Sequence, residues 1–533
     1  MERMTFFLAV SSVLVLGAAV SVLGILVREV PLALGPEDRA RARRDLLVLA
    51  GLTVAGLVLR HSISLPWPVH PGEPLRSLAY NHLDPRQIFL CLVSMPASVL
   101  SYDPLAVCGV ASEVLGTLAV PATALLARVW AGRAAGLVAG LAAAASPALV
   151  QVSRTGNSSV AVASFLVVAL LATEVLARRR TLLAAIAAGL AWTLLFLTAP
   201  ESVGLAVVPI AWMFADPRLR AASRPAGHAP AVFVPMTLSV AFCAFLLAWG
   251  GTPEPAARTD PSYVRSLAGV ARATFAGTGP GAISVTAVAL LGLAATRGPV
   301  RIVAAVAVLD VLAVGALLAG RDGFDAESLR AASVIFGVPA LAVLHVLAGA
   351  AAAFAWGAGG GLFRRSAVIA AGVAVPVAHA FPLDRVRLPT PLQAEHRFLA
   401  SHVAELSGEP EFVVFGEERP DVRVQVAYRA EVADEEQTGA ILGSIVTQRW
   451  CVLGIDQARA TRESRGDRLH YVRGWAEHDP LVATTASPRR WLEVLESAWE
   501  VVPIASEAVE VIPDETHPEG AMEVGLFRLR GKE

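Results

Sequence analysis

Charged residues are scarce in this chain of 533 residues. Asp, Glu, Lys and Arg together make up 17% of it, against about 25% in a typical soluble protein. Hydrophobic residues make up 55%, and the mean hydropathy is +0.59. One globular core does not bury that much apolar surface, so the composition predicts a polytopic α-helical membrane protein. It also excludes a disordered chain, a coiled coil and a collagen.

Cysteines are few, and no basic block occurs. The four cysteines show no metal-ligand spacing, and only Cys451 lies after residue 382, which excludes a disulfide framework there. We expect no cofactor, and a divalent metal stays an open alternative that no residue pattern indicates. The net charge is −1, so we expect no nucleic acid as a partner. The apolar composition makes membrane lipids the expected partners.

Charge is unevenly distributed along the chain. Residues 383–533 hold 27 acids and 17 bases, and residues 1–382 hold 18 acids and 27 bases. The composition changes at the proline-containing stretch 382–392, where we place a domain boundary. The sequence thus predicts a transmembrane domain over 1–382 and a soluble domain over 383–533.

Apolar stretches of membrane length recur up to residue 381. We expect about twelve transmembrane helices, near 5–27, 45–60, 104–127, 134–150, 158–177, 181–199, 203–215, 231–249, 281–296, 299–320, 328–355 and 366–381.

Every second connection between these spans is rich in arginine. The arginine-rich connections are 28–44, 128–133, 178–180, 218–224, 297–301 and 364–365. Because positive residues favour cytoplasmic loops, we expect these six connections inside the cell. The long loop 61–103 and the domain 383–533 are then outside.

The final domain has an α/β pattern. We expect strands at 411–415, 422–428, 450–455, 500–504 and 523–529, and helices at 392–407, 434–448 and 488–499.

The outer loop 61–103 is too long for a simple turn, and it is rich in proline, histidine and carboxylates. It contains Gly72-Glu73 and the run Asn81-His82-Leu83-Asp84-Pro85. After the next span come a basic Gly-Arg turn, Arg128 to Arg133, then Ser146-Pro147 and Ser153-Arg154. Further on, Arg330 begins a proline-containing apolar run.

This ordered series, over roughly residues 45–381, resembles the membrane-embedded GT-C glycosyltransferases. It is most similar to the branch of protein mannosyltransferases, aminoarabinose transferases and RgtA-like enzymes. The resemblance implies a GT-C-like membrane domain and an extracytoplasmic α/β domain in a bacterial inner membrane. It implies an inverting transfer of a sugar from a polyprenyl-phosphate donor to a lipid, glycan or protein acceptor.

The resemblance also implies roles for individual residues. The first acid of the family's Asp/Glu pair falls on Gly72, so either Glu73 or Asp84 is the candidate base, and a carboxylate suits that task. The candidates for donor-phosphate binding are Arg330, Arg154 and Arg76, because guanidinium groups bind phosphate oxygens bidentately. His82 and Tyr80 are the candidate substrate-binding residues.

Other interpretations remain open at this level. The acids of loop 61–103 also fit a solvated loop, and each arginine also fits a side chain reaching the lipid headgroups. A transporter or flippase is the rival function, although the sequence shows no inverted repeat. A non-catalytic scaffold is the third, given Gly72. Glu174 and Asp310 interrupt apolar spans, and we expect structural polar contacts for Asp310.

Overall fold

The fold is described from a computed structural model. The described residues are 2–34, 36–63, 104–153, 158–198, 200–224, 228–249, 289–293, 296, 298–321, 326–357, 411–415, 450–454, 481–485, 499–510 and 520–531. The chain divides into two compact units, one built of helices and one containing a β-sheet. The predicted division at 382/383 remains a prediction.

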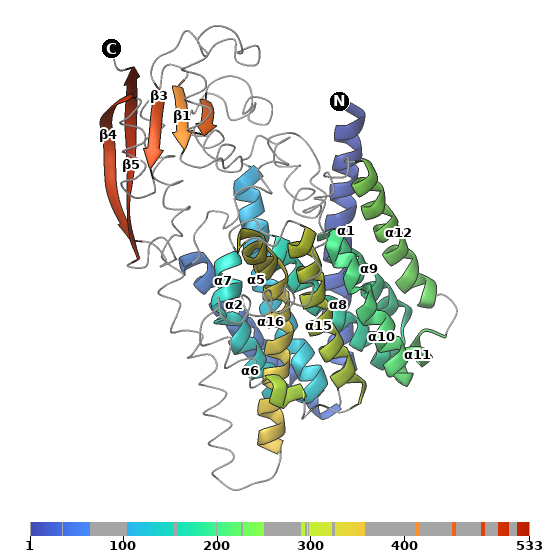
Figure 1. Ribbon diagram of the computed structural model, residues 1–533. Coiled ribbons are helices and arrows are strands. Elements are labelled where there is room, and N and C mark those ends of the chain that lie inside the picture. The colour runs from blue at the N-terminus through green and yellow to red at the C-terminus, as the bar shows by residue number, and fades with distance from the viewer. Residues whose placement is uncertain are drawn as a thin grey trace. The chain divides into compact units, whose positions relative to one another are not determined.

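The helical unit is a bundle (Figure 1). Its helices are α1 (Glu2–Ala33), α2 (Pro36–Ile63), α5 (Pro104–Ala131), α6 (Arg133–Ala144), α7 (Pro147–Val152), α8 (Ser158–Arg179), α9 (Leu182–Thr198), η2 (Pro200–Ala206), α10 (Val207–Ala215), α11 (Pro217–Ala222), α12 (His228–Trp249), α15 (Pro299–Arg321) and α16 (Ala326–Gly357).

Helices occupy most of the predicted spans, with two corrections. The span expected at 134–150 is broken into α6 and α7, because Ser146 is extended and Pro147 begins a new helix, where its missing N–H is tolerated. The span at 203–215 begins as the 3-10 helix η2. The span at 366–381 and most of 281–296 lie outside the described residues, so the number of about twelve remains a prediction.

Helix α8 forms the centre of the bundle, since its side chains from Val160 to Ala177 are almost all inaccessible. It packs against α9, α16, α1 and α11. Small residues allow close packing elsewhere. Gly349 of α16 faces the backbone of Ala135 in α6, where a Cβ on the glycine would overlap the Ala135 carbonyl oxygen.

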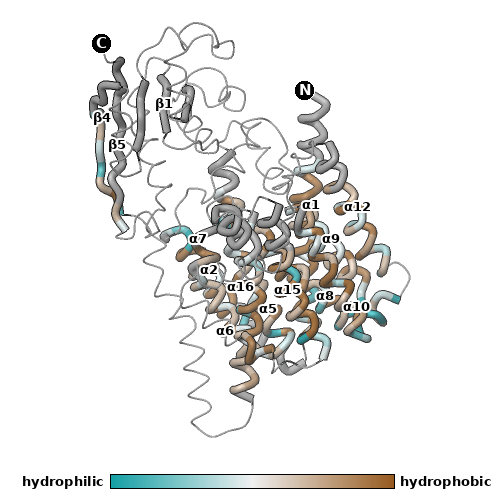
Figure 2. Tube along the Cα trace, viewed as in Figure 1, coloured by the Kyte–Doolittle hydropathy of each residue, from teal (hydrophilic) through white to brown (hydrophobic). Residues whose placement is uncertain are grey.

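The outer surface of the bundle is apolar. Large hydrophobic side chains such as Val13, Val27 and Leu238 are more than half exposed. Figure 2 shows hydrophobic colouring along the bodies of the helices. Among the described residues, four segments are long and apolar enough to cross a membrane: Ser11–Ala33, Gly109–Ala131, Ser159–Arg179 and Gly337–Ala355. Spans of this length with large apolar side chains exposed on their surface are typical of helices in lipid, so the chain is a helical membrane protein.

Ion pairs gather at one end of the bundle. Asp45 of α2 contacts Arg128 and Arg133 around the α5–α6 turn, each at 2.8 Å. Glu29 of α1 pairs with Arg179 at 3.2 Å. These residues come from three arginine-rich connections, so those connections lie together, as predicted for loops on one side. We call this the Arg-rich end.

The sheet of the second unit has the strand order β2-β1-β3-β5-β4. Its strands are β1 (Glu411–Phe415), β2 (Trp450–Gly454), β3 (Leu481–Thr485), β4 (Trp499–Glu510) and β5 (Ala521–Gly531). β1 is parallel to β2 and β3, and β5 is antiparallel to β3 and β4. A register shift between Pro503 and Ala505 interrupts the β4–β5 pairing.

Four of the five predicted strands coincide with observed ones, and β3 is additional. The predicted helix 488–499 is wrong at its end, because Trp499 begins β4 and pairs with Gly531. The other residues of the three predicted helices, and the strand 422–428, lie outside the described residues. The α/β class of this domain therefore remains a prediction.

Candidate functional site

A cluster of polar residues lies at the C-terminal end of α2, where the chain enters the predicted outer loop. This end of α2 is the one away from the Arg-rich end. The cluster consists of Arg60, His61, Glu113, Gly116 and Ser153, and we call it the Arg60 cluster. Fifteen residues separate Asp45 from Arg60 in α2, and fifteen separate Glu113 from Arg128 in α5. At 1.5 Å per residue, both intervals span about 22 Å, so the cluster lies near the opposite side of the bundle.

Arg60 is fully buried, with 0% of its surface exposed. Its Nη1 donates to the carbonyl oxygens of Gly56 at 2.9 Å and Ala144 at 3.5 Å, and its Nη2 donates to that of Ala143 at 3.2 Å. Ala143 and Ala144 end α6, so these carbonyls have no donor within their own helix. They also carry the negative end of the helix dipole. Arg60 therefore caps α6 from a neighbouring helix.

Ser153 receives the remaining contact from Arg60. The Arg60 Nε donates to Ser153 Oγ at 3.1 Å, and the Ser153 hydroxyl donates to the Leu149 carbonyl of α7. Gly116 of α5 leaves the space for this pair, because a Cβ there would overlap Ser153 Oγ. Arg60 thus joins the ends of α6 and α7 and fixes Ser153, the residue directly before Arg154.

The neighbouring His61 faces a carboxylate. Its Nδ1 lies 3.1 Å from Glu113 Oε1, and the side chains are 72% and 11% exposed respectively. Glu113 also interacts electrostatically with Arg60. A buried guanidinium is costly without opposite charge and acceptors, and here Glu113 and four oxygen atoms supply both. The cluster combines a fixed cation, a carboxylate and an accessible imidazole.

Most of the predicted site residues lie outside the described residues: Glu73, Arg76, Tyr80, His82, Asp84 and Arg154. Arg330 belongs to the second turn of α16, and only its backbone is described. Gly349 of the same helix lies against Ala135, close to the Arg-rich end. Arg330 and Gly349 are nineteen positions apart in α16, an interval that spans about 28 Å. Arg330 therefore lies at the same end of the bundle as the Arg60 cluster.

The two intramembrane carboxylates differ in their contacts. Glu174 is buried and pairs with Arg178 at 2.7 Å, one turn further along α8. Asp310 lies at the middle of α15, and its Oδ2 accepts no hydrogen bond from the described part of the chain. The polar contact expected for Asp310 is therefore not seen at this oxygen. Nor do the described residues contain a group of three His, Cys, Asp or Glu side chains suited to a metal ion.

The Arg60 cluster was not anticipated from the sequence. Arg60 stands at the end of a short apolar span, and Glu113 interrupts the apolar span 104–127. A buried charge in a membrane helix is a recognised sign of a polar partner. That signal was available, but nothing in the sequence pairs residue 60 with residue 153.

No family model matches the sequence, and no curated protein matches it. Solved structures do match. ArnT from Cupriavidus metallidurans in the apo state is 14% identical with a TM-score of 0.53, covering 91% of this chain and 98% of that chain. ArnT bound to undecaprenyl phosphate gives the same identity and coverage with a TM-score of 0.50. The apo oligosaccharyltransferase of Archaeoglobus fulgidus is 14% identical with a TM-score of 0.45, covering 92% and 74% respectively.

The ArnT likeness extends over nearly the whole of both chains, and it shows that this chain has a GT-C fold. The fold expected from the ordered motifs of residues 45–381 is thereby confirmed.

Proposed function

We propose that this protein is an inverting glycosyltransferase of the bacterial inner membrane, which moves a sugar from a polyprenyl-phosphate donor to an acceptor outside the cytoplasm. The observation that carries the proposal is the GT-C fold shared with ArnT, of which one structure contains undecaprenyl phosphate. The ordered motifs of the sequence support it independently.

The reaction needs few groups. An acceptor hydroxyl attacks the anomeric carbon from the face opposite the phosphate, the bond from that carbon to the phosphate oxygen breaks, and polyprenyl phosphate leaves with the bonding electrons. A carboxylate takes the hydroxyl proton as general base. We assign this role to Glu73, with Asp84 as the alternative, and assign sugar or acceptor binding to His82 and Tyr80.

The leaving phosphate needs positive charge. We assign this to Arg330, Arg154 and Arg76, because a guanidinium group forms two parallel hydrogen bonds with phosphate oxygens. The placement of Arg330 at the same end of the bundle as the Arg60 cluster supports this assignment. Arg60 is a positioning residue in this proposal, since its hydrogen bond holds Ser153 and thereby the start of the segment that carries Arg154.

The proposed topology places the substrate groups outside the cell. The Arg-rich end is cytoplasmic, and the Arg60 cluster, loop 61–103 and the domain 383–533 are extracytoplasmic. Three connections already meet at one end through ion pairs, which supports a common side for the arginine-rich loops.

A reconstituted transfer assay tests the function. Purified protein in proteoliposomes is given radiolabelled polyprenyl-phosphate sugars and acceptors, both extracted from bacterial membranes. We expect label to move from the lipid fraction to an acceptor only when the protein is present. Movement of intact labelled lipid across the bilayer without transfer would instead identify a flippase. If the protein showed neither activity, the non-catalytic scaffold would be favoured.

A further inference from the structure

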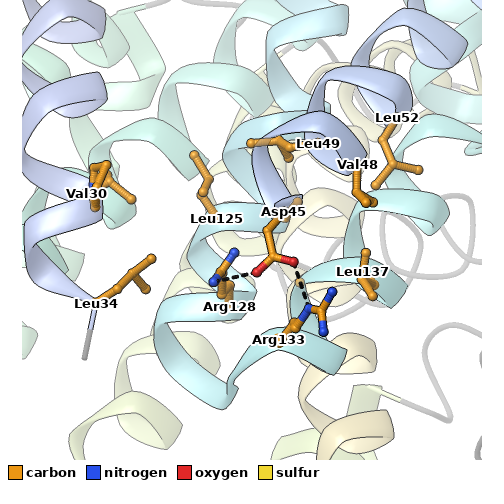
Figure 3. Close-up of a pocket in the computed structure, with 13 residues that line it drawn as sticks. Val30, Leu34, Asp45, Val48, Leu49, Leu52, Leu125, Arg128, Arg133 and Leu137 are labelled. Atoms are coloured by element: carbon orange, nitrogen blue, oxygen red, sulfur yellow. Dashed lines mark ion pairs between the residues drawn. The ribbon is translucent and has the colours of Figure 1, made fainter. Parts of the chain in front are cut away.

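A groove opens between helices at the Arg-rich end, far from the proposed transfer site. Apolar side chains line it: Val30 and Leu34 of α1, Leu49 and Leu52 of α2, Leu125 of α5 and Leu137 of α6. The groove is open to solvent, and the empty space in and in front of it is about 590 Å³. Figure 3 shows Val30 and Leu34 facing Leu125 and Leu49 across the gap. The gap exists because α1 packs mainly on α8 and α9 rather than on α2.

Two arginines share one carboxylate in this groove. Arg128 Nη2 and Arg133 Nε each lie 2.8 Å from an oxygen of Asp45. Asp45 and Arg128 are nearly buried, at 8% and 10% exposure, whereas Arg133 is 48% exposed. Arg133 uses its Nε in the pair, and Figure 3 shows its two terminal nitrogens turned away from Asp45. The three charges leave one positive charge in excess.

The other ion pairs at this end are balanced. Arg178 pairs with Glu174 and Arg179 with Glu29, while Arg218 meets Asp216 at 2.7 Å. Among the described ion pairs at this end, the excess of positive charge therefore belongs to the group formed by Asp45, Arg128 and Arg133. The sequence adds to it, because Arg39, Arg41, Arg43 and Arg44 precede Asp45 in α2 against two acids, Glu37 and Asp38.

We propose that this groove binds a phospholipid with an anionic headgroup. The phosphate is held by the exposed guanidinium of Arg133, and an acyl chain runs between α1 and α2. From Asp45 to Leu52 the apolar wall extends about 10 Å along α2. Lipid tails are as apolar as the groove wall, so the tail adds little preference. Selectivity comes from the charge, as for other basic pockets between membrane helices.

Lipid binding to the full-length protein tests the proposal. The protein is purified in neutral detergent, stripped of lipid and titrated with phosphatidylglycerol or with phosphatidylcholine of the same acyl chains, with bound lipid counted by native mass spectrometry. We expect phosphatidylglycerol to bind at least about tenfold more tightly, because phosphatidylcholine would bring its choline cation next to the excess positive charge at Arg133 whereas the glycerol headgroup is uncharged. Equal affinities would overturn the proposal. So would displacement of the lipid by inorganic phosphate at the same concentration, or binding of undecaprenyl phosphate alone.

Variants locate the site. Arg133→Gln should weaken phosphatidylglycerol binding about tenfold, and Arg133→Lys should weaken it less. Arg220→Gln is the matched control, because Arg220 is an exposed helical arginine outside the groove, and it should bind as the unaltered protein does. Val48→Trp fills the groove without changing charge and should also weaken binding. Unchanged binding in both Arg133→Gln and Val48→Trp would overturn the proposal, and Val48→Trp decides alone if Arg133→Gln unfolds.

Discussion

Arg60 and Ser153 are 93 residues apart in the sequence, yet Arg60 Nε donates a hydrogen bond to Ser153 Oγ at 3.1 Å. The same guanidinium group caps α6 through the Ala143 and Ala144 carbonyls. One buried side chain thus holds the break between α6 and α7 and the end of α7. Substitutions at the residues that form these contacts should therefore lower the stability of the bundle.

Replacing Arg60 should destabilise the bundle. Arg60→Ala leaves buried carbonyls and the Ser153 hydroxyl without a donor, which should cost about 3 kcal/mol. We expect the thermal unfolding midpoint in detergent to fall by a few degrees. Arg60→Lys keeps the charge but has three N–H donors instead of five and lacks the planar fork, so its midpoint should be intermediate. Arg220→Ala, at an exposed position, is the control. A midpoint of Arg60→Ala equal to that control would contradict the capping role.

Gly116 should not tolerate a side chain. A Cβ at this position would overlap Ser153 Oγ, so Gly116→Ala forces α5 and α7 apart and should cost about 1–3 kcal/mol. The double variant Gly116→Ala with Ser153→Ala removes the overlapping oxygen and should recover part of that loss. Gly51→Ala in α2 is the matched control, because nothing lies within 4 Å of its Cβ position. It should be neutral or slightly stabilising. Equal unfolding midpoints for Gly116→Ala and Gly51→Ala would disprove the close contact.

The sequence predicted the helical bundle well, because apolar runs of membrane length leave few alternatives to a helix in lipid. It predicted the break at Ser146-Pro147 poorly. We interpreted a run that is apolar on both sides of a proline as one span, although a residue before proline favours the extended conformation that Ser146 adopts. The strand β3 was also missed. Its sequence LVATT is short, and its strand character comes from pairing with β1 and β5.

The candidate site rests on the resemblance of its motifs, and it stays a prediction because loop 61–103 lies almost wholly outside the described residues. Composition and spacing place acids in loop 61–103 and an arginine at the start of α16, and the fold places that arginine at the same end as the Arg60 cluster. Contacts such as His61 with Glu113 depend on how α2 packs on α5. Hydropathy predicts that each segment is a helix, but it does not predict which residues of two neighbouring helices contact each other.

The orientation of the tail follows from the arginine-rich loops. If the domain 383–533 lies outside the cytoplasm, protease added to intact spheroplasts should remove it, and a tag at the C-terminus should be lost from immunoblots. A cytoplasmic protein monitored in the same sample should remain intact until the membrane is lysed. Protection of the tail before lysis would reverse the topology and remove the basis for an outer transfer site.

Two isosteric variants distinguish between the two candidate bases, Glu73 and Asp84. Glu73→Gln removes the proton acceptor with little change in shape, so transfer should fall about 100-fold or more, the usual contribution of a general base. Asp84→Asn should retain most of the activity. The measurement is the transfer rate in proteoliposomes at saturating donor, with equal insertion of both proteins verified first. The reverse pattern would assign the base to Asp84, and full activity in both would exclude this loop from the chemistry.

Arg330 should hold the donor's phosphate rather than only a lipid headgroup. Its backbone lies in the second turn of α16, about 28 Å along the helix from Gly349. The proposed topology puts this turn at the membrane face where a polyprenyl phosphate would present its charge. A charged hydrogen bond to phosphate contributes about 1.5–3 kcal/mol. Arg330→Ala should therefore weaken the apparent donor affinity by roughly one to two orders of magnitude. Arg330→Lys should restore part of it, because the charge remains while the bidentate geometry is lost. Transfer rates measured against donor concentration distinguish the two variants, with Arg154→Ala as a parallel test of the second candidate. Unchanged donor affinity in both Arg330 variants would mean that Arg330 anchors the helix at the interface and takes no part in binding the donor.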